Sequence, residues 1–141
     1  MKNYFILLCL LPTIGFAQFD SENDVLNHLS GNHYKLWFFV KYDINMGGNT
    51  TCEKGKAYTF YKSKKIIIKE CVNGTWEEKE YQYSLEKDSP YDWWIKFNNE
   101  RYYLVMLNRG EYLETKLRTM ESLHNKIDES EDIILKHFID D

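Results

Sequence analysis

Histidine is the residue type in this sequence best suited to proton transfer near neutral pH and to metal binding. The chain has four histidines, His28, His33, His124 and His137, and no two stand at the four-residue spacing that places two imidazoles on one helix face. The sequence also lacks the motifs typical of serine hydrolases, phosphate-binding loops and zinc proteases. We therefore expect packing or surface histidines, no metal or cofactor, and a protein that is not an enzyme.

Cysteine is the second residue type with distinctive chemistry. Cys9 lies in an apolar N-terminal stretch, whereas Cys52 and Cys71 lie in the body of the chain. An even pair of cysteines in an exported protein favours a disulfide bond, so we expect Cys52 to be joined to Cys71. Two separate buried thiols are the alternative, and zinc is disfavoured because no histidine lies near either cysteine in the sequence.

The N-terminus has the layout of a secretory signal peptide. A basic start at Lys2 precedes an apolar stretch from Tyr4 to Phe16, and Ala17 is a small residue of the kind found at cleavage sites. The apolar stretch is shorter than the roughly 20 residues that cross a bilayer, which makes a retained membrane anchor the weaker alternative. We expect residues 1–17 to be removed, the protein to be secreted or periplasmic, and no integral membrane segment to remain after cleavage.

Composition points to one folded domain over residues 18–141. The chain has 141 residues, is 43% hydrophobic and 16% aromatic, and has only two prolines, which excludes disorder and low-complexity repeats. Its formal net charge of −4 offers no basic surface for nucleic acid. The partners expected are therefore a small apolar ligand or another protein, and not nucleic acid.

The hydrophobic pattern predicts an all-β fold, an up-and-down antiparallel meander or barrel of about eight strands with a short N-terminal helix. Ser21 and Asp24 fit a capping box, so a helix is expected over Ser21–Leu29. Strands are expected around residues 34–41, 58–60, 66–68, 81–85, 93–97 and 103–107. Asn73-Gly74 and Asn98-Asn99 are expected turns, and Asp43–Thr51 an expected loop.

The segment after Gly110 fits both strand and helix periods. We favour a strand over Tyr112–Thr119, because the preceding turn returns the chain beside the previous strand, and a helix or loop over Glu121–Asp128. Ile133–Phe138 fits either a closing strand or a terminal helix.

The high content of aromatic residues is the most informative feature of the sequence for function. Alternation predicts these inward-facing side chains: Leu36, Phe38, Val40, Tyr58, Phe60, Ile66, Ile68, Tyr81, Tyr83, Trp93, Ile95, Phe97, Tyr103 and Val105. From this set, the candidate wall of a ligand cavity is formed by Phe38, Tyr58, Phe60, Tyr81, Trp93 and Tyr103. Two alternatives stay open: the rings simply fill the interior, or Trp94 and Tyr102, on the opposite parity, form an outward patch for a protein partner.

The sequence resembles the lipocalin-like small β-barrels of bacterial envelopes. The likeness rests on Leu29-x-Gly31 leading into an aromatic first strand and on the stretch from Cys52 to Trp76, which contains Asn73-Gly74-Thr75-Trp76. It implies an exported, non-enzymatic protein that holds a small apolar ligand inside a barrel. The alternative function is an inhibitor or immunity-type envelope protein that binds another protein through loops and exposed aromatic residues.

Overall fold

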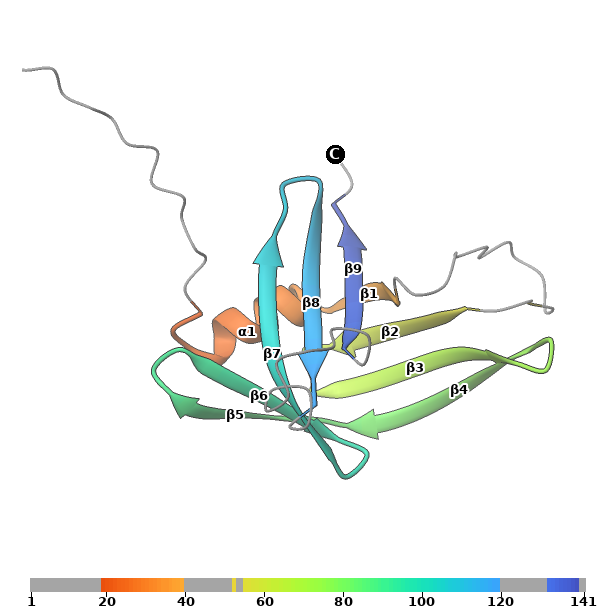
Figure 1. Ribbon diagram of the computed structural model, residues 1–141, viewed down its shortest axis with the longest axis horizontal. Helices are drawn as coiled ribbons and strands as arrows, with labels where there is room; N and C mark the ends of the chain where they lie inside the picture. The colour runs from red at the N-terminus through yellow and green to blue at the C-terminus, as the bar shows by residue number, and fades with distance from the viewer. Residues whose placement is uncertain (1–18, 40–51, 53–54, 120–131, 140–141) are drawn as a thin grey trace, which may run out of the picture.

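The computed structural model describes residues 19–39, 52, 55–119 and 132–139 and shows an all-β protein with one short helix (Figure 1). Helix α1 spans Glu22–Ser30. The strands are β1 (Tyr34–Phe39), β2 (Lys56–Tyr61), β3 (Lys65–Val72), β4 (Thr75–Gln82), β5 (Ser84–Ser89), β6 (Asp92–Phe97), β7 (Glu100–Asn108), β8 (Tyr112–Arg118) and β9 (Ile133–Phe138). No helix in these ranges is long and apolar enough to cross a membrane.

The capping box predicted at Ser21 is confirmed. The backbone N–H of Ser21 donates to Asp24 Oδ2 at 2.9 Å, and the backbone N–H of Asp24 donates to Ser21 Oγ at 3.2 Å. The Ser21 hydroxyl also donates to Asp24 Oδ2, at 2.6 Å, and this bond, together with the one from the Ser21 backbone N–H, lowers the pKa of the Asp24 carboxyl below its usual value. Gly31 ends α1 at φ 59°, and its N–H donates to the Asn27 carbonyl at 3.0 Å.

The nine strands form one curled antiparallel sheet of order β4-β3-β2-β1-β9-β8-β7-β6-β5 (Figure 1). Except for β4 and β5, strands that follow each other along the chain either pair directly or belong to the same half of the sheet, and β9 pairs with β1, as in an up-and-down barrel. The sheet is open between β4 and β5, so it forms a half-barrel. Tyr83 alone separates these two edge strands. Its N–H donates to Lys64 O at 2.8 Å and its hydroxyl to Tyr61 O at 2.9 Å.

The two predicted turns are present, and their residues have the positive φ angles that tight hairpin turns require. Asn73 and Gly74 have φ values of 51° and 82°, and Asn98 and Asn99 have values of 51° and 59°. Two consecutive residues with positive φ match the twist of a two-residue hairpin, and Asn and Gly adopt that backbone most readily. The first turn joins β3 to β4 and the second joins β6 to β7.

The predicted disulfide is present: Cys52 is bonded to Cys71, with their Cα atoms 5.9 Å apart. Cys52 precedes β2 and does not lie opposite Cys71 in the β2–β3 ladder. Backbone hydrogen bonds from Cys52 N to Gly74 O and from Cys71 N to Gly55 O, at 3.1 and 3.0 Å, hold the segment against the end of the β3–β4 hairpin.

The core lies on the concave face of the sheet, where α1 contributes Val25 and Leu29. The buried cluster comprises Val25, Leu29, Trp37, Tyr58, Phe60, Ile66, Tyr83, Trp93, Ile95, Phe97, Leu104, Leu117 and Leu135. Ile68 and Tyr81 pack against it. The predicted inward face is therefore confirmed for β2, β3, β4, β6 and Tyr83.

The predicted inward face was wrong for β1. Trp37 is fully buried and packs in the core, so Leu36 and Phe38 lie on the outer face. Both faces of this strand carry large apolar residues, so alternation alone does not define the buried face. Inside the protein, the Trp37 indole N–H donates to Leu29 O at 2.8 Å, and its ring contacts the rings of His28 and His137.

The same correction applies to β7. Leu104 is buried and Tyr102 and Met106 pack against the core, which places Tyr103 and Val105 on the outer face. The Tyr103 hydroxyl donates to Asp92 Oδ1 at 2.8 Å there. Burial of the ring, and then this bond, raise the pKa of the Tyr103 hydroxyl. Hydrogen bonds from Ser89 and Tyr103 lower the pKa of the Asp92 carboxyl.

The strand favoured over Tyr112–Thr119 is confirmed as β8, and Ile133–Phe138, which fitted either a strand or a helix, forms the closing strand β9. Other predictions lie outside the described residues: the signal peptide at 1–17 with Cys9, the loop at 43–51, Val40, and the helix or loop at 121–128. The strand predicted over 81–85 is interrupted at Tyr83, where the chain passes from β4 to β5.

Candidate functional site

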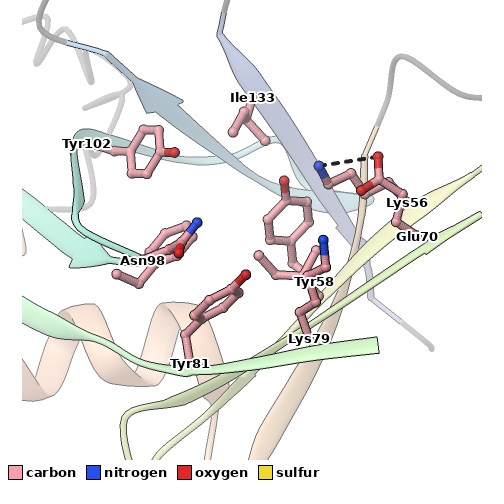
Figure 2. Close-up of a pocket in the computed structure, with 10 residues that line it drawn as sticks. Lys56, Tyr58, Glu70, Lys79, Tyr81, Asn98, Tyr102 and Ile133 are labelled. Carbon is pink, nitrogen blue, oxygen red and sulfur yellow. Dashed lines mark ion pairs between the residues drawn. The ribbon is translucent and has the colours of Figure 1, made fainter. Parts of the chain in front are cut away.

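A cavity of about 200 Å³ opens at one end of the curled sheet (Figure 2). One wall comes from β2, β3 and β4, and the opposite wall from β6, the β6–β7 turn, β7 and β9. The two halves of the sheet therefore face each other across this space. Its lining residues are Lys56, Tyr58, Ile68, Glu70, Lys79, Tyr81, Phe97, Asn98, Tyr102 and Ile133.

Strand register explains the first wall. Tyr58 pairs with Ile68, and Ile68 pairs with Lys79, so these three side chains form one row across β2, β3 and β4. Two residues further out, Lys56 pairs with Glu70 and forms the rim. Tyr81, two residues from Lys79 on the same strand face, lies on the side of the core.

The opposite wall is mainly aromatic. Phe97 and Tyr102 are stacked, with ring centroids 5.2 Å apart and an interplanar angle of 27°. The ring centroids of Tyr81 and Phe97 lie 6.4 Å apart, so the two walls meet at these residues. Asn98, held at positive φ by the hairpin turn, and Ile133 of β9 complete this side.

Two lysines and one glutamate bring charge to the cavity. The Lys56 ammonium lies 3.6 Å from Glu70 Oε1 and 5.7 Å from the centre of the Tyr58 ring. Lys79 forms no ion pair with any residue in the described ranges. Burial, and then the nearby Glu100 carboxylate, raise the pKa of the Tyr102 hydroxyl, so this phenol stays protonated and able to donate.

The structure brings together only part of the predicted ligand wall. Tyr58 and Tyr81 line the cavity. Phe60 and Trp93 belong to the packed core below it, whereas Phe38 and Tyr103 lie on the outer face of the sheet.

The charged lining residues were missed by the sequence analysis, which selected aromatic positions only. Lys79 stands two residues before Tyr81, and Glu70 two residues after Ile68, so extending the same alternation would have found both. Tyr102, which one open alternative placed in an outward patch, lines the cavity. Trp94 does lie on the outer face, but it is only 7% exposed, with the Arg101 guanidinium 4.1 Å above its ring.

A second feature is a cluster of rings on the outer face where β1, β8 and β9 meet. Phe138 lies 6.4 Å from Phe38 and 6.3 Å from Tyr112, between ring centroids. The Lys136 ammonium lies 4.3 Å from the Tyr112 ring. Phe138 is 56% exposed, so this outer cluster presents apolar surface to solvent.

The histidines occupy separate environments. His28 is buried, with Nε2 2.9 Å from Thr115 Oγ1, and His137 Nδ1 lies 2.9 Å from Leu36 O. His33 is exposed, and His124 lies outside the described residues. No group of three or more potential metal ligands occurs within the ranges that the structure describes.

Comparison of this chain with protein families, with curated proteins and with solved structures finds no match. The cavity at the end of the half-barrel and the outer cluster are therefore the features on which a function can be argued.

Proposed function

We propose that this protein is an exported, non-enzymatic binding protein that holds a small ligand in the cavity at the open end of its half-barrel. The observation that carries the proposal is the convergence of hydroxyl, amide, charged and apolar side chains from both halves of the sheet on one space. A few polar groups set in an apolar wall are typical of small-molecule sites. The signal-peptide pattern and the disulfide support export.

The shape of the site changes the kind of ligand expected. A ligand held deep inside the barrel needs about 300 Å³ or more. The cavity measures about 200 Å³ and lies at the end of the sheet, while Phe60, Trp93 and Phe97 are buried in the core. The proposed ligand is therefore small, and it combines an apolar body with a polar group instead of being wholly apolar. A lipocalin-like assignment is part of this proposal and is supported by the curled sheet with its N-terminal helix.

Two matched substitutions on β3 test the site. Ile68 faces the cavity, whereas Ile67 faces outward between Thr59 and Glu80. Small-molecule fragments are screened against the protein by ¹H–¹⁵N chemical-shift perturbation. Fragments that bind are expected to shift the amides of the cavity strands, Ile68→Trp to abolish this binding, and Ile67→Trp to leave it unchanged.

The result is interpretable only for folded variants. Circular dichroism and the amide spectrum show whether Ile68→Trp keeps the fold, and Ile133→Phe fills the cavity from the opposite wall if it does not. Fragments that bind equally well to both folded cavity-filling variants, or none that bind at all, would contradict the proposal.

The outer cluster supports a second candidate function, binding of another protein. Phe138 is 56% exposed and lies beside Tyr112 and Phe38, so the three rings form an exposed apolar patch. Such patches are typical of protein-binding surfaces. A photo-crosslinking residue at position 138 is expected to capture one defined partner from the native compartment. The same residue at Tyr91, 70% exposed, serves as the control. Equal crosslinking from both positions would reject this candidate.

A further inference from the structure

Resting on the proposed function, we infer that the ligand is a small organic anion, a carboxylate attached to a flat apolar body, with the carboxylate bound by Lys79. The inference concerns the chemical class of the ligand and follows from the arrangement of charge, hydroxyl groups and rings in the cavity.

Of the three charged side chains that line the cavity, two form an ion pair with each other and one does not. Lys56 and Glu70 neutralise each other across β2 and β3, at 3.6 Å. Lys79, one strand further on, lines the same space with no ionic partner among the described residues. Glu77 pairs with Glu70 in the β3–β4 ladder but is not one of the residues that line the cavity. The lining therefore carries one uncompensated positive charge, which favours an anion.

Other hydrogen-bond donors lie near Lys79 in the same cavity. Figure 2 shows the side chains of Lys79, Tyr81 and Tyr102 around one central space, with the hydroxyl groups of Tyr81 and Tyr102 directed into it and Lys79 at its side. An ammonium group and phenolic hydroxyls can all donate to carboxylate oxygens, and bonds to a charged acceptor are stronger than neutral ones. Asn98 supplies an amide at the edge of this group.

The remaining lining suits a flat apolar body. The stacked rings of Phe97 and Tyr102 give a planar wall, and Ile68 and Ile133 give aliphatic contacts from opposite halves of the sheet. Aromatic rings prefer offset or edge contacts with such walls. A cationic ligand would instead face Lys79, because Glu70 is already engaged by Lys56.

Three probes of nearly equal size and different charge test the inference: benzoate, benzamide and benzylamine. Each is titrated into the full mature protein, with chemical shifts of Lys79, Tyr81 and Tyr102 as the readout. Benzoate is expected to bind most tightly and benzylamine least. Lys79→Gln should weaken benzoate binding about tenfold, the effect of losing one charge-assisted hydrogen bond, and leave benzamide binding unchanged.

Lys96→Gln is the matched control, because Lys96 is exposed on the outer face of β6 and does not line the cavity. It removes the same charge and should leave benzoate binding unchanged. An equal loss in Lys79→Gln and Lys96→Gln would show a general effect of net charge and overturn the inference.

The probes also separate the inference from the function it rests on. If benzamide binds in the cavity as tightly as benzoate, or if Lys79→Gln binds benzoate as the wild type does, the anionic class is wrong and a ligand-binding cavity remains. If none of the three probes shifts the cavity resonances at millimolar concentration, both the anionic class and the proposed function fail.

Discussion

The imidazole of His28 and the hydroxyl of Thr115, 87 positions apart in the sequence, lie 2.9 Å apart in the interior. This hydrogen bond links α1 to β8 across the concave face of the sheet. The His28 ring also contacts Phe19 and Trp37, with centroids 5.2 and 5.3 Å away. His28 is therefore a packed core residue whose neutral form fits its surroundings.

Stability is expected to fall at mildly acidic pH because of His28. Burial, with a further contribution from the Lys35 and His137 charges, lowers the pKa of His28 from 6.5 to about 3. Between these values the unfolded chain binds the proton and the folded protein does not, so the contribution present above pH 6.5 is lost as the pH falls toward 3. From pH 7 to pH 4.5 this group should cost about 2 to 3 kcal/mol in the free energy of unfolding.

Urea unfolding of the wild type and of His28→Gln at both pH values measures this cost. The variant is less stable at pH 7 because its packing is altered, but it should lose less stability on acidification than the wild type does. Identical pH dependence in the two proteins would show that the imidazole is protonated in the folded state or that other groups dominate.

The disulfide is expected to stabilise the fold by about 3 kcal/mol, since it closes a loop between residues 19 positions apart. The double variant Cys52→Ser with Cys71→Ser should therefore unfold at lower urea concentration, and reductant should shift the wild type by a similar amount. Intact mass of exported material with and without reductant gives the thiol count. Two free thiols in the native protein would refute the bridge.

Gly55→Ala is expected to destabilise the protein by about 1 to 3 kcal/mol through overpacking. A Cβ atom at Gly55, where φ is 152°, would lie 2.8 Å from Cη2 of Trp76, a rigid ring. Gly110→Ala is the control: Gly110 also has positive φ, 89°, but a Cβ there meets nothing within 4 Å. Thermal unfolding should show the larger loss for Gly55→Ala, and Trp76→Leu should relieve most of the excess. Equal losses at the two glycines would leave backbone strain as the whole effect.

Trp93 is expected to fasten the segment that precedes α1. Its indole N–H donates to the Phe19 carbonyl at 2.8 Å, and Lys87 donates to the Asp20 carbonyl at 2.7 Å. Trp93→Phe keeps an aromatic ring but removes the donor, so hydrogen exchange in α1 should accelerate with a stability loss of about 1 kcal/mol.

Trp94→Phe is the matched control for this substitution. The Trp94 indole nitrogen is buried with no hydrogen-bond partner in the part of the chain described, so its removal breaks no bond. If Trp93→Phe and Trp94→Phe alter exchange in α1 equally, the Phe19 contact does not hold the helix in place.

Local signals in the sequence predicted the elements well. The capping box at Ser21, the turns at Asn73-Gly74 and Asn98-Asn99, and the Cys52–Cys71 pair each depend on a few neighbouring residues or on residue type, and each is confirmed. The strand after Gly110 was favoured because of a local turn and is also confirmed.

The buried face of a strand was less predictable, and the site depended on it. In β1 and β7, large apolar residues occupy both faces, and pairing with distant strands decides which face is buried. Trp37, for example, pairs with Tyr58, 21 positions along the chain, and both are core residues. The cavity needed Lys79, Glu70 and Tyr102 from different strands, and their convergence depends on the curl of the whole sheet, which no local pattern encodes.

The open edge between β4 and β5 gives the seam between β1 and β9 an unusual importance. Among the described residues, strand pairing passes from one half of the sheet to the other only there, through Phe38 with Lys136 and Phe39 with Leu135. Each half is a meander of local hairpins that can form early, whereas this short ladder joins strands about a hundred residues apart and carries a large loop-closure entropy. The two halves that face each other across the cavity are therefore brought together by the most non-local pairing in the sheet, and formation of that seam is the step that creates the cavity.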